Sequence, residues 1–126
     1  MVPRSAISDS EYQVMKIIWA YGAPITTNEI IEKLKQNSAW HPKTIGTLLT
    51  RLVKKGALMP EVEGRGFIYT PMIQEAEFLD SEIEIFVDRL YGGKASLLIA
   101  HLLEQGNLTV DEMTKLNSIL KSKLSK

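Results

Sequence analysis

The spacing of apolar residues changes abruptly after Gly56, and this change limits the folds that the chain can adopt. Up to Gly56 the apolar residues recur at intervals of three and four, as in helices that are buried on one face. Residues 57–70 instead follow a period of about two, interrupted by Gly64-Arg65-Gly66, which predicts two short strands joined by a turn. Because a two-stranded hairpin is only marginally stable alone, it must pack on the helices that precede it.

The first two of three helices expected before the hairpin carry clear start signals. Ser8 or Asp9 caps the first helix, and Glu11 is in place to complete a capping box. Thr26 or Thr27 caps the second helix. After the hairpin the pattern is helical again, and three further helices are expected before the end of the chain.

The predicted fold class is mainly α, in two domains. Residues 1–72 form an N-terminal winged helix-turn-helix of three helices plus a β-hairpin wing, and residues 73–126 form a three-helix dimerisation domain. So short a C-terminal part cannot easily close a core alone, and its apolar residues exceed what one small layer buries. We therefore expect a homodimer. The residues expected at its interface are Phe86, Leu90, Leu97, Leu98, Leu102, Leu103, Met113, Leu116 and Leu120.

Charge is balanced over the whole chain but divided unevenly. Residues 1–72 carry nine basic and six acidic groups, and residues 73–126 carry six basic and nine acidic groups. Four cations and no anion lie between Lys43 and Lys55, which suits either a solvated helix face or a polyanion partner. The chain has no cysteine, and no apolar run approaches the ~20 residues of a membrane span. A cytoplasmic protein without membrane insertion is expected.

The residues needed for catalysis or for cofactor binding are sparse. The only histidines are His41 and His101, and neither lies in a pattern typical of a nucleophile and its base. Two histidines without cysteine cannot form a usual structural zinc site, and Gly64-Arg65-Gly66 is too short for a nucleotide-binding loop. We expect no catalytic residue, no metal ligand and no cofactor.

The third expected helix combines an apolar face with a polar one. It begins near His41-Pro42, where a proline costs no hydrogen bond, and it ends at Gly56. Its polar face mixes cations suited to phosphates with short hydroxyls suited to base edges. The order of helix, helix, polar helix and wing predicts DNA binding. The residues expected to bind DNA are Pro42, Lys43, Thr44, Gly46, Thr47, Thr50, Arg51 and Lys54, together with Arg65 at the hairpin tip.

Several segments resemble the BlaI/MecI-type repressors of penicillinase and methicillin-resistance genes. The longest is Ser38–Gly56, and the others are Ile7–Trp19, Glu63–Pro71 and Leu90–Gly93 with Ser96-Leu97. The resemblance covers nearly the whole chain. It implies a bacterial homodimeric transcriptional repressor of antibiotic-resistance genes that binds a palindromic double-stranded DNA operator. The residues that match the family's recognition helix are Lys43, Thr44, Thr47, Thr50 and Arg51, with Lys54 and Arg65 as phosphate contacts.

Two positions depart from the family pattern. Gly46 stands where relatives often carry a longer residue, so operator preference can differ. Well-known members are inactivated by a membrane-bound sensor protease that cleaves an Asn-Phe bond, and the aligned pair here is Ala100-His101. The sequence leaves open whether a sensor protease is a partner and whether cleavage occurs at this pair.

Two other functions stay open at this point. A winged helix can bind protein rather than DNA, and the near-zero net charge favours that reading slightly. The chain can also repress other genes and be released by a different signal, such as a small ligand. A steep loss of binding with rising salt would favour DNA over a protein partner.

Overall fold

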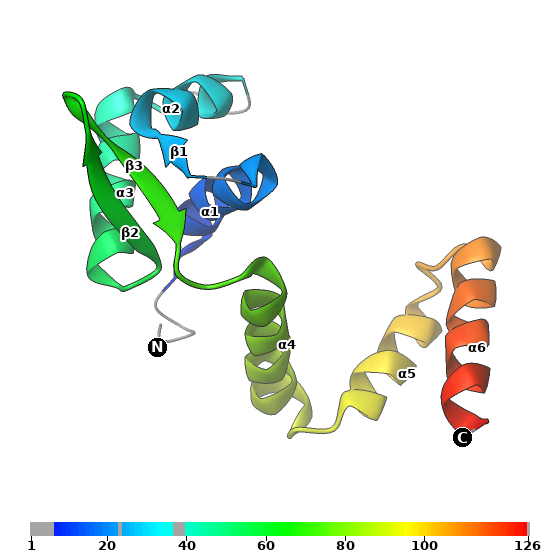
Figure 1. Ribbon diagram of the computed structural model, residues 1–126. Helices are drawn as coiled ribbons and strands as arrows, with labels where there is room; N and C mark the ends of the chain where they lie inside the picture. Colours follow the sequence, from blue (N-terminus) through cyan, green and yellow to red (C-terminus); the bar gives the residue numbers. More distant parts are fainter. Residues whose placement is uncertain (1–6, 23, 37–39, 126) are drawn as a thin grey trace. The chain divides into compact units, whose positions relative to one another are not determined.

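The computed structural model describes residues 7–22, 24–36 and 40–125. Contacts divide the chain into two compact units, residues 1–83 (the N-terminal unit) and 84–126 (the C-terminal unit). The predicted mainly α fold is confirmed, and the predicted domain boundary after residue 72 stays a prediction. The elements are α1 (Asp9–Tyr21), β1 (Ile25–Thr26), α2 (Thr27–Lys35), α3 (Pro42–Lys54), β2 (Leu58–Glu63), β3 (Gly66–Pro71), α4 (Glu75–Tyr91), α5 (Ala95–Gln105) and α6 (Val110–Leu124) (Figure 1).

Three helices begin at capping boxes. In each box, the side chain of the N-cap residue accepts a hydrogen bond from the backbone N–H three residues later, and the side chain of that later residue accepts one from the N-cap N–H. Ser8 and Glu11 form the box of α1, and Thr26 and Glu29 form the box of α2. Thr109 caps α6 together with the residue three positions later. Each box satisfies backbone donors that the first helical turn leaves unpaired, so these starts are set locally by sequence.

The sheet has three antiparallel strands in the order β1-β3-β2. β2 and β3 form the predicted hairpin, with Leu58 opposite Pro71 and Glu63 opposite Gly66. The third strand, β1, pairs through Ile25 with Tyr69 and was not predicted. Two residues are too few to show a period in sequence, and only the hydrogen bonds to β3 reveal the strand.

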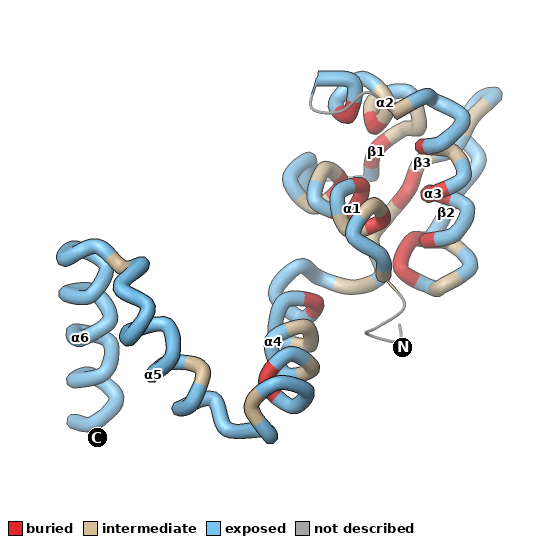
Figure 2. Tube along the Cα trace, turned by 180° about the vertical axis from the view of Figure 1, so that it is seen from behind, coloured by how far each residue is buried: buried red, intermediate tan, exposed pale blue. Residues whose placement is uncertain are grey.

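The core of the N-terminal unit lies between α1, α2, α3 and the sheet (Figure 2). Each helix contributes apolar residues spaced three or four apart, as the helical period requires. This core fixes the inner face of α3 and so leaves its opposite face outward. The buried apolar residues of this core cluster are Val14, Met15, Ile18, Ile25, Ile30, Leu34, Ile45, Leu48, Leu49, Leu52, Ala57, Leu58 and Tyr69.

The first turns of α4 belong to the N-terminal unit and are held there by aromatic side chains. The Phe78 ring stacks on Tyr12, with centroids 5.3 Å apart, and lies 5.6 Å from the Trp19 ring. The Trp19 indole N–H donates to the carbonyl oxygen of Ile73 at 2.9 Å. Phe78 is therefore buried, although the sequence pattern groups it with the C-terminal helices.

The C-terminal unit leaves its apolar side chains largely exposed. No residue of α5 or α6 is buried, and both helices are described throughout their length (Figure 2). Their leucines are spaced as on amphipathic helices, yet within these described helices none of them is buried. Across the described residues, no helix combines the length and the apolar character needed to cross a membrane.

Candidate nucleic-acid interface

Both ends of α3 are fixed by local chemistry. The Nδ1 atom of His41 accepts a hydrogen bond from the backbone N–H of Lys43 at 3.1 Å, and Pro42 occupies the first helical turn. At the other end Gly56 has a φ of 81°, and its N–H donates to the Val53 carbonyl at 3.0 Å. With the bond from Ala57 N–H to Leu52 O at 2.9 Å, this completes a Schellman motif. The helix therefore has sharp limits.

The outward face of α3 carries the residues predicted to bind DNA. The opposite face buries Ile45, Leu48, Leu49 and Leu52 in the core. Because residues three and four apart share a helix face, the polar residues gather on the side away from that core. Pro42, Lys43, Thr44, Thr47, Thr50, Arg51 and Lys54 are exposed, and Gly46 is half-buried. The predicted set thus lies on one continuous surface, with three cations among short side chains.

Two threonines of this face use their hydroxyl hydrogens within the helix. Thr47 Oγ1 donates to the Lys43 carbonyl at 3.1 Å, and Thr50 Oγ1 donates to the Gly46 carbonyl at 3.0 Å. Each hydroxyl oxygen keeps lone pairs that can accept, and each side chain also carries a methyl group. Such groups suit base amino groups and the thymine methyl in the major groove.

Gly46 opens a gap in the polar face. Apart from its chain neighbours and the backbone of α3 itself, a Cβ at this position would meet no atom within 4 Å, and the backbone of Gly46 has ordinary helical geometry. The glycine is therefore not required by packing inside the chain. Its effect is to expose backbone and to leave room for a partner to approach α3 closely.

Arg65 lies at the tip of the wing, as predicted. Glu63 pairs with Gly66, so Gly64 and Arg65 form a two-residue turn, and the φ of 60° at Gly64 is one that glycine adopts without strain. A shallow groove beside the tip is lined by the start of α2 and by the wing. Sequence reasoning missed this neighbourhood because it depends on the pairing of β1 with β3. The lining residues are Thr26, Thr27, Asn28, Glu63, Arg65, Gly66 and Phe67.

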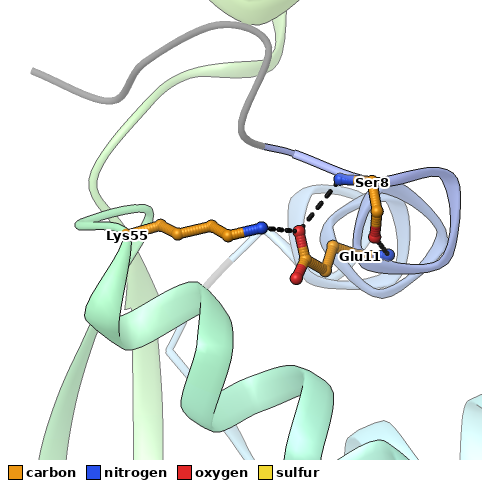
Figure 3. Close-up of polar contacts among 3 residues, drawn as sticks. All are labelled: Ser8, Glu11 and Lys55. Carbon is orange, nitrogen blue, oxygen red and sulfur yellow. Dashed lines mark hydrogen bonds and ion pairs between the residues drawn. The ribbon is translucent and has the colours of Figure 1, made fainter.

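One cation of the Lys43–Lys55 cluster is engaged inside the fold. The Lys55 ammonium bonds Glu11 Oε1 at 2.5 Å, and Glu11 is 1% exposed (Figure 3). Burial raises the pKa of the Glu11 carboxyl, but hydrogen bonds from Lys55 and from the Ser8 N–H, with the Lys55 charge, outweigh burial and lower that pKa overall. The outward cations of the cluster are therefore Lys43, Arg51 and Lys54.

A second predicted surface lies in the C-terminal part of the chain. Leu97, Leu102 and Leu103 are between 44% and 50% exposed in α5. Of the other residues predicted for the dimer interface, only Leu98 is as much as half-buried. The remainder, all exposed, are Phe86, Leu90, Met113, Leu116 and Leu120.

The pair Ala100-His101, for which the sequence left cleavage open, lies inside α5. Ala100 and His101 are both exposed. The Tyr91 hydroxyl lies 2.7 Å from His101 Nδ1, which links the end of α4 to the middle of α5. Within the described ranges, no three His, Asp or Glu side chains gather as a metal site would require.

The sequence matches one protein family over most of its length. The model of the family described as "Penicillinase repressor" matches residues 7–122. The penicillinase repressor of Bacillus licheniformis is 44% identical over 114 residues, which cover 90% of this chain and 88% of the relative. The methicillin resistance regulatory protein MecI of Staphylococcus aureus strain N315 is 34% identical over 117 residues, which cover 93% of this chain and 94% of the relative.

Two solved structures resemble part of the fold. The solution structure of the DNA-binding domain of the repressor BlaI is 52% identical, with a TM-score of 0.55, and the match covers 61% of this chain and 93% of that domain. The monomeric form of Bacillus licheniformis BlaI, solved in complex with the blaP half-operator, is also 52% identical. Its TM-score is 0.52, and the match covers 61% of this chain and 90% of that one.

Proposed function

We propose that this chain, which belongs to the penicillinase repressor family, is a cytoplasmic transcriptional repressor that binds a palindromic operator of β-lactam-resistance genes as a homodimer. The observation that carries the proposal is the outward face of α3, where three cations stand among hydroxyl groups on a helix fixed at both ends. A relative with a 52% identical DNA-binding domain has been solved on a half-operator.

Each group of the α3 surface has a chemical role in this proposal. Lys43, Thr44, Thr47 and Arg51 reach base edges in the major groove, since they share the face opposite the core. Thr50 and the partly exposed backbone at Gly46 allow close approach. Lys54 and Arg65 bind phosphates, and the backbone N–H groups after Pro42 offer a positive helix end to a further phosphate.

The partner of the C-terminal helices is a second copy of the chain. The exposed leucines of α5 and α6 support this assignment, because a monomer would leave them in water. A two-fold dimer then matches the two half-sites of a palindrome. A membrane sensor protease acting at Ala100-His101 is one route of release, and it stays a prediction.

The test is operator binding by the full chain and by two charge-removal variants. Arg51→Ala removes an outward cation of α3, and Lys16→Ala removes an exposed cation of α1 as a matched control. Arg51→Ala is expected to weaken binding to a blaP-type palindrome by roughly tenfold to a hundredfold, the worth of a good base contact. Lys16→Ala is expected to leave the Kd within about twofold, since it removes no base contact.

Fluorescence anisotropy at two salt concentrations supplies the measurement, with a scrambled duplex beside the palindrome. Binding should weaken steeply with salt, because bound phosphates release counterions. Equal affinity for palindrome and scrambled duplex would remove the operator assignment. Unchanged affinity in Arg51→Ala would remove the role of α3.

A further inference from the structure

Glu11 is the one buried charged residue among residues 7–22, 24–36 and 40–125. A single carboxylate oxygen, Oε1, accepts from the Ser8 N–H at 2.9 Å and from the Lys55 ammonium at 2.5 Å (Figure 3). Lys55 is partly exposed, with 29% of its side chain accessible. An unpaired buried carboxylate is costly, so this site strongly favours a conformation in which Lys55 stays on Glu11.

The pair joins the start of α1 to the C-terminal end of α3. Glu11 lies in the first turn of α1, and Lys55 is the C-cap of α3. Lys55 also directly precedes Gly56, where the Schellman motif ends the helix. The bond therefore ties the C-terminal end of α3, which carries Arg51 and Lys54, to the start of α1.

We propose that Glu11 is a positioning residue for DNA recognition, which acts through Lys55 to set where the last turn of α3 lies. The proposal rests on the proposed function and adds a buried residue that does not touch DNA. Any movement of this turn that separates Lys55 from Glu11 would leave the carboxylate with the Ser8 N–H as its remaining described bond. The last turn of α3 is thereby held in place before DNA arrives, which reduces the ordering cost of binding.

A competing role for Lys55 is direct phosphate contact. Its sequence neighbour Lys54 is assigned that role, and Lys55 belongs to the same run of cations. The two roles differ in salt dependence. A phosphate contact contributes about 0.9 to the slope of log Kd against log salt, whereas a positioning residue changes affinity without changing the slope.

The experiment measures salt-dependent binding of the full chain to a duplex carrying the blaP half-operator. The variants are Glu11→Gln, Lys55→Gln, their double variant and Lys55→Arg, with Lys54→Gln as the matched charge control. Glutamine at position 11 can still accept the Ser8 N–H bond, so the capping box survives the change. Circular dichroism at the assay temperature confirms that each variant is folded.

Glu11→Gln and Lys55→Gln are each expected to weaken binding by roughly threefold to tenfold, with the slope of the wild-type chain. The double variant should bind no more weakly than either single variant, because both remove the same interaction. Lys55→Arg keeps the charge and should retain most of the affinity. Lys54→Gln should lower the slope by about one.

Three outcomes would overturn the proposal. Tighter binding and a steeper slope in Glu11→Gln would mean that Glu11 withholds Lys55 from phosphate. A slope reduced by about one in Lys55→Gln would make Lys55 a contact. Fully additive effects would mean that the two residues act separately. If instead the wild-type chain fails to prefer the half-operator over scrambled DNA, the proposed function fails, and the outcome is distinct from these three.

Discussion

At the scale of single residues, Gly46 and Gly56 show how one amino acid serves two purposes. At neither glycine would a Cβ meet an atom within 4 Å, apart from those of the glycine, its chain neighbours and the backbone of its own helix. Gly46 lies inside α3 with ordinary helical geometry, whereas Gly56 has a φ of 81° and ends the helix. The first glycine therefore costs helix propensity, and the second avoids strain that other residues would meet.

Alanine at these two positions should change stability in opposite directions. Gly46→Ala is expected to raise the free energy of unfolding by about 1 kcal/mol, because alanine favours the helix and meets no obstacle. Gly56→Ala is expected to lower it by about 1 kcal/mol, because alanine disfavours positive φ. Urea unfolding of both variants gives the comparison. A loss of stability in Gly46→Ala would mean that the added methyl group clashes with a neighbour of α3 or strains the helix.

Residue patterns allowed part of the site to be predicted. The outward set on α3 follows from helical periodicity, so Lys43, Thr47 and Arg51 could be placed on one face from sequence. The bond between Glu11 and Lys55 could not be predicted, since it joins positions far apart in the chain. Glu11 instead has a sufficient local explanation as a capping-box residue, which hid its ion pair with Lys55.

At the scale of elements, the helices were easier to predict than the contacts between them. Helix starts such as Ser8 and Thr109 depend on neighbours three residues away, and these are visible in sequence. The strand β1 has two residues and depends on a partner in β3. The attachment of α4 through Phe78 and Trp19 is likewise tertiary, and the sequence pattern placed the domain boundary before it, after residue 72.

Phenylalanine-to-alanine substitutions at two sites would test the attachment of α4. Phe78→Ala is expected to lower the free energy of unfolding by about 3 kcal/mol, because the ring is 5% exposed between Tyr12 and Trp19. Phe67→Ala is the matched control on β3, where the ring is 45% exposed, and should cost less than about 1 kcal/mol. Thermal and urea unfolding supply both values. Equal costs would mean that Phe78 is not packed as described.

At the scale of the whole molecule, the two units differ in how they achieve stability. The N-terminal unit has a closed apolar core, whereas α5 and α6 bury no side chain within the chain. The excess of apolar residues in the C-terminal part was visible in sequence. The sequence of one chain does not say which molecule covers them, because that contact forms only on association. The assignment of that partner to a second copy therefore belongs to the proposed function.

A charged residue among the exposed leucines of α5 should disrupt the proposed dimer and spare the winged helix. Leu102→Asp places a carboxylate on α5 at a position that is 44% exposed in one chain. Analytical ultracentrifugation should show a shift from dimer to monomer, since burying an unpaired charge is costly. Lys121→Asp, at an exposed lysine of α6, is the charge control. A Leu102→Asp chain that stays dimeric would place the interface elsewhere.

The lack of buried side chains in α5 and α6 also has a consequence for gene dosage. For a repressor that is active as a dimer, the concentration of paired chains at low expression rises with the square of the total. A doubled copy number would then raise the dimer concentration by about fourfold. The occupancy of the operator would therefore rise steeply with the total concentration of the protein. For the proposed dimer, the amount of this protein in the cell would thus set when the regulated genes fall silent.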